Sequence, residues 1–274
     1  MQEMEGLHIG ICLLRKVRAT FPKIGKVLVV TLFGVTVNSC NTDAAPDCLQ
    51  SAGNLVRDEV SISDFTKITV FENISLVLKQ GEQTKVTVET GEFLLNEVSA
   101  TVEGDRLVLR DTNDCNYFRD YGSTTVFVTA PNIVEIRSST GWPIRSDGVL
   151  SYPSLTLLSE SFVNPESETT DGAFDLEVAN ENLNLVVNGI SYFKLRGTTG
   201  SLNLTIAAGD SRIEAQGLIA NTVGLNHRGS NDMLINPQQS LSGVIRGTGD
   251  VVSFTRPDVV DVEVLFNGRL FFRE

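Results

Sequence analysis

Apolar and polar residues alternate in short runs from about Val60 to the end of the chain. The clearest early runs are residues 68–70, 74–78, 85–88 and 106–109, with Gly, Asn and Asp between them. Successive side chains of a β-strand point to opposite faces of a sheet, so this alternation is typical of half-buried strands. Helical periodicity is limited to residues 92–98, a turn or two at most. The pattern therefore predicts an all-β fold.

Glycines recur at a nearly constant interval in the C-terminal half of the chain. The sequence positions are Gly189, Gly209, Gly229, Gly249 and Gly268, and each lies between two strand-like runs. Glycine suits a corner, where a positive φ or a close backbone approach would penalise a Cβ atom. A fixed period of this kind is the signature of stacked repeats.

Apolar side chains keep the same interval and form two columns, two positions apart. The first column is Phe193, Ile213, Met233, Val252 and Leu270; the second is Leu195, Ala215, Ile235, Phe254 and Phe272. A spacing of two places both columns on one face of each strand, with Arg212 and Glu214 facing outward. Such columns predict a parallel β-solenoid with coils of about 20 residues, each coil laid on the previous one.

The spacing extends towards the N-terminus with one interruption. Gly141 lies one such interval before Ser161, but the step from Ser161 to Gly189 is longer, and a polar insert between Asn164 and Asp171 accounts for the excess. Inserts in repeat folds become loops at one edge, and such loops often carry function. We interpret this insert as a flexible acidic loop without a function; a functional loop is the alternative.

The first 39 residues have the pattern of an export signal. A basic segment ends at Lys26, and an apolar run follows it at positions 27–37. This run is far shorter than the ~20 residues that a membrane-spanning helix needs. It ends in V-N-S-C, which resembles a bacterial lipobox, so Cys40 is the predicted lipid-attachment residue. A soluble secreted protein cleaved near Ser39 is the alternative.

Cysteine usage agrees with export. Once Cys12 is removed with the signal peptide and Cys40 carries lipid, Cys48 and Cys115 remain. An even pair in an oxidising compartment predicts a disulfide. A zinc site is disfavoured, because two sulfurs without a nearby histidine do not complete a zinc shell.

Several stretches together resemble a known family. They are D-F-T-K-I-T-V-F-E-N-I-S-L-V-L-K-Q-G from Asp64, T-K-V-T-V-E-T-G-E-F-L-L-N-E-V from Thr84, V-E-G-D-R-L-V-L from Val102 and the glycine repeats after Asn188, behind the lipoprotein leader. The combination resembles the "putative autotransporter adhesin head GIN domain" family, whose members are abundant in Bacteroidota cell envelopes. The resemblance implies a right-handed parallel β-helix on an exported protein, and it carries over no catalytic residues. The predicted domains are a signal peptide at 1–39, a lipidated tether at 40–58 and a GIN-type β-solenoid at 59–274.

Composition and charge restrict the partners. The chain has 274 residues, 41% of them hydrophobic, which is typical of a folded protein. Without the five basic and two acidic residues of segment 1–39, the 22 basic and 34 acidic residues fall to 17 and 32, a net charge of −15. This charge repels nucleic acid and anionic headgroups, so a polyanionic partner requires a local basic patch or a bound cation. Contact with a membrane is expected only through the lipid anchor, and the oligomeric state stays open.

Residues with catalytic or metal-binding chemistry are few. His227 has no second histidine near it in the exported part and is interpreted as a surface or corner residue, not a base. Asp210 and Asp250 follow corner glycines and could ligate calcium, but turn chemistry accounts for them equally, and the calcium-binding nonapeptide repeat is absent. No nucleophile elbow or phosphate-binding loop occurs. No cofactor, metal or catalytic residue is predicted.

An aromatic cluster lies close to Cys115 in the sequence. It consists of Tyr117, Phe118, Tyr121 and Trp142. We interpret it as a cap over the open end of the solenoid; a sugar-stacking platform is the alternative.

Three functional classes follow. The first is a non-enzymatic envelope lipoprotein, anchored in the outer membrane, whose solenoid surface adheres to glycans or proteins. The second is a polysaccharide lyase or hydrolase on a β-helix, because carboxylate pairs for glycoside hydrolysis are defined by spatial position and not by sequence spacing. The third is a periplasmic structural or stress-sensing lipoprotein.

Overall fold

A computed structural model describes Cys48, residues 50–113, Cys115, Tyr117, residues 122–163 and residues 167–273. The predicted signal peptide, Cys40, Phe118, Tyr121 and residues 164–166 of the insert lie outside the described residues. Strands account for most of the described chain, as the alternation predicts. Helix is confined to short 3-10 turns, the clearest of which is η2, Leu95–Glu97, within the stretch that has helical periodicity.

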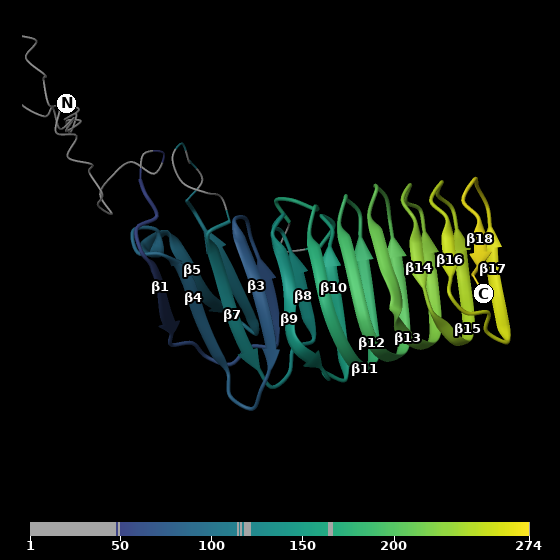
Figure 1. Ribbon diagram of the computed structural model, residues 1–274, viewed down its shortest axis with the longest axis horizontal. Coiled ribbons are helices and arrows are strands. Elements are labelled where there is room, and N and C mark those ends of the chain that lie inside the picture. Colours follow the sequence, from purple (N-terminus) through teal and green to yellow (C-terminus); the bar gives the residue numbers. More distant parts are fainter. Residues whose placement is uncertain are drawn as a thin grey trace, which may run out of the picture. The chain divides into compact units, whose positions relative to one another are not determined.

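The described residues form eighteen strands in one hydrogen-bonded sheet (Figure 1). The N-terminal strands are β1 Leu55–Val60, β2 Lys67–Val70, β3 Ile74–Gln80, β4 Lys85–Gly91, β5 Val98–Glu103, β6 Arg106–Asp111 and β7 Thr124–Ala130. The strands that follow are β8 Glu135–Ser138, β9 Pro143–Leu150, β10 Ser154–Ser159, β11 Ala173–Val187, β12 Tyr192–Ile206, β13 Arg212–His227, β14 Met233–Ile235, β15 Pro237–Ile245, β16 Val251–Ser253, β17 Val259–Val264 and β18 Leu270–Phe272. The prediction of an all-β chain is confirmed.

From β8 onward the strands pair in parallel, each with a strand of the next repeat. β11 pairs with β12 and β12 with β13, so that Phe193 lies between Phe174 and Ile213. β13 then pairs with both β14 and β15, which pair with β16 and β17. Ile213 in turn pairs with Met233, and Figure 1 shows the strands side by side up to the yellow C-terminal end. The predicted repeat length is therefore present in the hydrogen bonding.

The polar insert lies where the longer interval predicts it. Leu155 of β10 pairs with Leu183 of β11, and the ladder continues without a shift between these strands. The extra residues fall between the end of β10 and the start of β11. The additional length is therefore accommodated outside the ladder.

The apolar residues of successive repeats form one continuous core. Phe193, Ile213, Met233 and Ile235 are fully buried, as the column pattern predicts. The rings of Phe174 and Phe193 stack with their centroids 4.7 Å apart and their planes 6° apart. Each repeat thus buries its inward side chains against those of the repeats before and after it.

Two positions of the predicted columns are wrong. Met233 pairs with Val251 and not with Val252, and Ile235 pairs with Ser253 and not with Phe254. The ladder continues from Ser253 to Phe272. The repeat that leads from β14 to β16 is shorter than the interval that the glycines indicate, so both inward positions move one step towards the N-terminus.

The shorter repeat has its origin at the corner before β16. This corner contains two glycines, Gly247 and Gly249, and it is Gly247 that lies over Gly229 of the previous corner: a Cβ atom on Gly247 would lie 2.0 Å from the Gly229 carbonyl oxygen. The sequence pattern instead aligned Gly249 with Gly229. Gly249 lies over Asn231, where its Cβ atom would be equally close to a carbonyl oxygen.

The N-terminal strands depart from the parallel arrangement predicted for residues 59–274. β1 pairs with β4, β4 with β7 and β5 with β6 in antiparallel fashion. The turn between β5 and β6 consists of Gly104 and Asp105, and Gly104 has a φ of 66°. So short a turn joins antiparallel strands only, whereas a parallel pair needs a longer crossover.

Candidate ligand-binding surface

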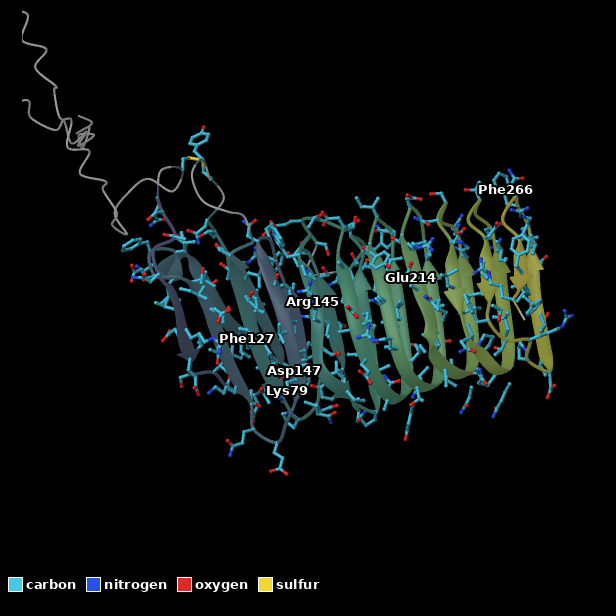
Figure 2. All side chains as sticks on the ribbon, in the orientation of Figure 1. Lys79, Phe127, Arg145, Asp147, Glu214 and Phe266 are labelled. Atoms are coloured by element: carbon cyan, nitrogen blue, oxygen red, sulfur yellow. A yellow bond between two sulfur atoms is a disulfide. The ribbon has the colours of Figure 1, made fainter. Side chains whose placement is uncertain are left out.

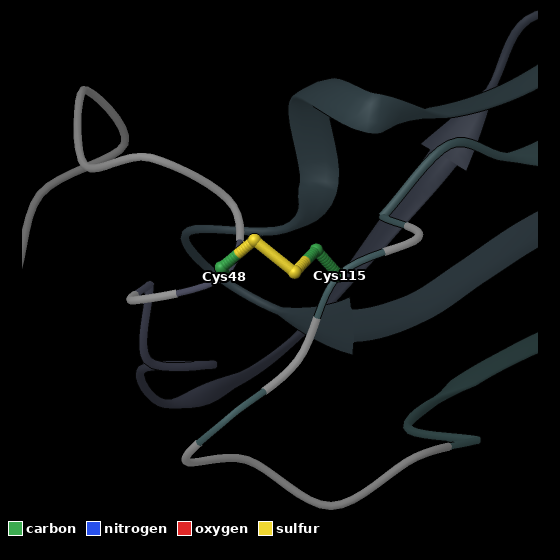
Figure 3. The surroundings of a disulfide bond; sticks show 2 residues. All are labelled: Cys48 and Cys115. Carbon is green, nitrogen blue, oxygen red and sulfur yellow. A yellow bond between two sulfur atoms is a disulfide. The ribbon is translucent and has the colours of Figure 1, made fainter.

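Cys48 and Cys115 are joined in a disulfide, the pair that the cysteine count predicts (Figure 3). Their Cα atoms are 4.4 Å apart, and they are separated by 67 residues in the sequence. The backbone N–H of Tyr117 donates a hydrogen bond to the carbonyl oxygen of Cys48 at 3.2 Å. The disulfide thus ties the residues before β1 to the segment that follows β6.

Two members of the predicted aromatic cluster are described. Tyr117 is 73% exposed beside the disulfide. Trp142 lies between β8 and β9 and is half-buried; a Cβ atom on Gly122 would lie 2.4 Å from its ring. Gly122 has a φ of 71°, which glycine adopts without strain. Its lack of a Cβ atom also allows the close approach of the indole. The tryptophan therefore packs on the segment before β7.

His227 is fully buried, and the expectation of a surface or corner position is wrong. It is the last residue of β13 and continues the inward alternation of Val223 and Leu225. Burial lowers the pKa of His227, while the backbone of Asn231 and of Gly249 opposes this effect in part. A buried imidazole with a lowered pKa is kept neutral by its surroundings.

Asp210 and Asp250, the two aspartates that follow corner glycines, have partners within the protein. Asp210 accepts a hydrogen bond from the Ser230 hydroxyl at 2.6 Å. Asp250 forms an ion pair with Arg269 at 2.8 Å, and this hydrogen-bonded guanidinium lowers the pKa of Asp250. Within the described ranges no three His, Cys, Asp or Glu side chains are grouped so that they could hold a metal ion.

A column of polar side chains crosses the outward face of the repeats. Tyr192 of β12 donates its hydroxyl to Glu214 of β13, and Arg212 donates to the same carboxylate at 2.9 Å. The next repeat contributes Asp232, 3.7 Å from the Arg212 guanidinium. The hydrogen bond from Tyr192 and then the one from Arg212 lower the pKa of Glu214, and the same contact raises the pKa of Tyr192. Figure 2 labels Glu214 on this face, which agrees with the outward orientation predicted for Arg212 and Glu214.

The corners between strands form a shallow groove, called here the corner groove. Its cavity volume is about 540 Å³. The residues 207–211, 228–232, 246–250 and 265–269 make up four successive corners of this side. Ile190 of the preceding corner and Phe266 of the last one add exposed apolar side chains, 67% and 59% accessible. In Figure 2 Phe266 lies at the corner edge of the C-terminal repeats.

Hydrogen bonds between corners align two arginines on adjacent repeats. The N–H of Arg228 donates to the carbonyl oxygen of Ile206 at 2.9 Å, and the N–H of Arg246 to that of His227 at 2.7 Å. Ile206 and His227 are the last residues of β12 and β13, so the arginines occupy the same position in successive corners. Both side chains are exposed and line the corner groove.

A second row lies two residues further along in the same corners. The N–H groups of Asp210, Ser230 and Thr248 donate to the glycine carbonyls of the previous corner at 2.9, 2.9 and 3.1 Å. These three residues therefore also share one position in successive corners. Neither row was predicted from the sequence, although the recurring Arg-Gly pairs at 228–229 and 246–247 were a visible signal.

The described part of the insert is partly fixed to the sheet. The Ser139 hydroxyl accepts a hydrogen bond from the N–H of Glu168 at 2.6 Å. Beneath it, Arg137 and Glu160 form a fully buried ion pair at 2.7 Å. Phe162 and Val163, in contrast, are exposed.

Within the described residues, no helix combines the length and the apolar character that crossing a membrane requires. The described residues thus form an all-β domain of stacked strands whose outward face carries ordered polar side chains. Residues 64–257 match the model of the family "Putative auto-transporter adhesin, head GIN domain". The chain belongs to this family. An adhesin family indicates a location in the cell envelope or outside the cell.

Solved structures share the fold. A "putative adhesin" from Bacteroides fragilis superposes with a TM-score of 0.71 at 19% identity, covering 81% of this chain and 99% of its own. A "putative lipid binding protein" from Parabacteroides distasonis has a TM-score of 0.59 at 16% identity, with 81% and 98% covered. A "putative adhesin" from Parabacteroides merdae has a TM-score of 0.53 at 16% identity, with 81% and 98% covered. No match was found among curated proteins.

Proposed function

We propose that the chain is a non-enzymatic envelope lipoprotein whose outward face adheres to glycans or proteins. The observation that carries this proposal is the register of polar side chains across repeats. Tyr192, Arg212, Glu214 and Asp232 come from three successive repeats and form one connected set. Membership of an adhesin head family and the two adhesin-named structures are consistent with such a surface.

The strands from β8 onward are proposed to wind as a right-handed parallel β-helix. Connections between parallel strands of one sheet are right-handed in about 98% of cases, because a right-twisted strand packs back onto the sheet only that way. An experimental structure that traces the connection from β12 to β13 with left-handed winding would contradict this.

Anchoring through Cys40 is part of the proposal. Residues 1–39 would be removed as a signal peptide, residues 40–58 would form the tether, and residues 59–274 the GIN-type domain. A lipidated protein should partition into detergent and carry a mass increment on the peptide that begins at Cys40. A wholly aqueous protein with a free amine at another residue would contradict the anchor.

A polysaccharide lyase or hydrolase has less support. A general acid needs a raised pKa to hold its proton near neutral pH. Hydrogen bonds from neighbouring side chains instead lower the pKa values of Asp105, Glu214 and Asp250. A periplasmic structural or stress-sensing lipoprotein would share the fold and the anchor, and differs in the side of the outer membrane that it faces.

One experiment separates these functions. A glycan array, together with binding of the labelled protein to intact cells, tests adhesion, and protease shaving of the producing cells tests surface exposure. We expect binding on the array or on cells, and release of domain fragments by shaving. Cleavage of a polysaccharide that one carboxylate substitution abolishes would favour the enzyme. Absence of binding together with resistance to shaving would favour the periplasmic role.

A further inference from the structure

Arg228 and Arg246 are two cations without a carboxylate partner in a strongly acidic protein. Many of the other described cationic side chains form ion pairs, including those of Arg196, Arg212 and Arg269. Among the described residues, no Asp or Glu oxygen lies within ion-pair distance of Arg228 or Arg246. Both guanidinium groups are exposed at the corner groove. This is a local basic patch of the kind that an anionic partner of this chain requires.

The spacing of the two arginines follows from the ladder. They occupy the same position of successive corners, and hydrogen-bonded strands lie roughly 4.8 Å apart. A ligand that binds both must run across the repeats, along the direction of stacking, and offer anionic groups on one side. Arginine binds carboxylates through two parallel N–H donors, which makes it selective for planar oxyanions.

The second row of the groove can form hydrogen bonds with hydroxyl groups of a ligand. Thr248 can donate or accept hydrogen bonds, whereas Ser230, whose hydroxyl already donates to Asp210, and the Asp210 carboxylate can accept them. The Asp210 carboxylate would repel a ligand whose anionic groups lie against it. A saccharide that carries both carboxylates and hydroxyls along its chain satisfies both rows.

The ends of the groove are apolar. Ile190 and Phe266 lie among the lining residues and are largely exposed. Apolar side chains beside a few fixed polar groups are the usual composition of small-molecule sites. The C–H face of a sugar ring can cover an aromatic ring such as Phe266 without loss of hydrogen bonds.

We infer that the corner groove binds an acidic glycan, a saccharide chain bearing uronate carboxylates, which Arg228 and Arg246 hold on adjacent repeats. The inference rests on the proposed adhesive function and names its ligand class. An acidic peptide fits less well, since it offers no hydroxyl on each unit to Asp210, Ser230 and Thr248.

Calorimetric titration of the full chain with defined saccharides tests the inference. The probes are hexagalacturonate and hexamannuronate, which carry a carboxylate on every unit, with methyl-esterified hexagalacturonate as the neutral match and hexaglutamate as the acidic peptide. Binding of at least one uronate hexasaccharide is expected, weaker at high salt, with little binding of the ester or the peptide. Arg228→Gln and Arg246→Gln should each weaken binding roughly tenfold, since each removes charge-assisted hydrogen bonds.

Arg145→Gln is the matched control. Arg145 of β9 is also exposed, has no ion-pair partner in the described part of the chain and does not line the groove (Figure 2). The Arg145→Gln variant should bind the uronate as the wild type does. This variant, Arg228→Gln and Arg246→Gln should all keep the wild-type melting temperature. Arg228→Lys should retain only part of the affinity, because an ammonium group lacks the planar pair of donors.

Four results would overturn the inference: no binding of either uronate, equal binding of the ester, equal binding of hexaglutamate, or loss of affinity in Arg145→Gln that matches the groove variants. If other glycans or cells still bind, the adhesive function stands and only this ligand class fails. If nothing binds on the array or on cells, the proposed function fails as well.

Discussion

Ile235 pairs with Ser253 in the parallel ladder between β14 and β16, and the next residue, Phe254, is left at the edge of the core. The N–H of Phe254 still donates to the carbonyl oxygen of Ile235 at 2.8 Å, and the centroid of its ring lies 5.5 Å from the Arg273 guanidinium. Its side chain is only half-buried, whereas Phe193 is fully buried. The two phenylalanines should therefore respond differently to truncation.

Phe193→Ala should lower the free energy of unfolding by about 3–5 kcal/mol, because it leaves a cavity and removes the stack on Phe174. Phe254→Ala should cost roughly 1–2 kcal/mol. Urea denaturation followed by circular dichroism measures both. Phe193→Leu serves as the conservative control and should cost about 1 kcal/mol. Equal losses for Phe193→Ala and Phe254→Ala would contradict the register.

Reduction of the disulfide between Cys48 and Cys115 should lower stability without abolishing the fold. The chain-entropy model gives about 4 kcal/mol for a closed loop of this length, less any strain. The double variant Cys48→Ser, Cys115→Ser should keep its far-ultraviolet spectrum and melt at a lower temperature. A reducing agent should leave the melting temperature of that variant unchanged. Two free thiols in protein isolated from cells would show that the bond does not form there.

Acidification should destabilise the protein first through His227. Its folded-state pKa is lowered below the usual value by burial, so the unfolded chain binds the proton more tightly. The stabilisation by the neutral imidazole is present above the unfolded pKa of about 6.5 and is lost as the pH falls below it. Glu214 and Asp250 also have lowered pKa values, and their stabilisation is lost only below about pH 4.5.

Unfolding measured between pH 8 and pH 5 tests the contribution of His227. The sequence has one other histidine, His8, which lies outside the described residues. His227→Gln should therefore flatten the dependence between pH 7 and pH 5, whatever its effect on stability at pH 8. An unchanged slope in this variant would assign the effect to another group.

The ion pair of Arg137 with Glu160 should matter far more than an exposed one. Both side chains are 1% exposed, so Glu160→Gln leaves a buried guanidinium without its counter-charge and should cost about 3–5 kcal/mol. Asp147→Asn breaks the pair with Lys79, visible in Figure 2, in which both side chains are more than half exposed. It should barely change the free energy of unfolding. Similar losses in the two variants would argue against the burial of Arg137.

The repeats could be predicted from the sequence because apolar residues recur at a nearly constant interval at the inward positions. Phe193 pairs directly with Ile213 and Ile213 with Met233, and alternation alone places them on one face. The predicted register of the C-terminal repeats was wrong at the corner R-G-T-G, residues 246–249. Either glycine of this corner can occupy the turn, and only the contact with the carbonyl groups of the previous corner distinguishes them.

Pairing partners in the N-terminal half had no comparable signal. The runs that became β4 and β5 alternate as clearly as the later strands, but alternation does not encode whether a neighbour is parallel or antiparallel. The burial of His227 could have been predicted from its place two positions after Leu225, and its residue type led to the opposite interpretation. The rows of the corner groove depend on contacts between corners, which the sequence alone does not fix.

The disulfide also sets the path of mechanical tension through the protein. Cys48 precedes β1, and Cys115 follows β6, 67 residues further along. A pull on the chain upstream of Cys48 passes through the sulfur–sulfur bond directly to Cys115, so the residues between the two cysteines cannot be drawn out while the bond is intact (Figure 3). The load then enters the sheet through β1, which follows Cys48, and through β6 and β7, which flank Cys115, and not through β1 alone. Under the proposed adhesive function, tension on the tether is thereby shared among three strands, and β1 does not separate from β4 first.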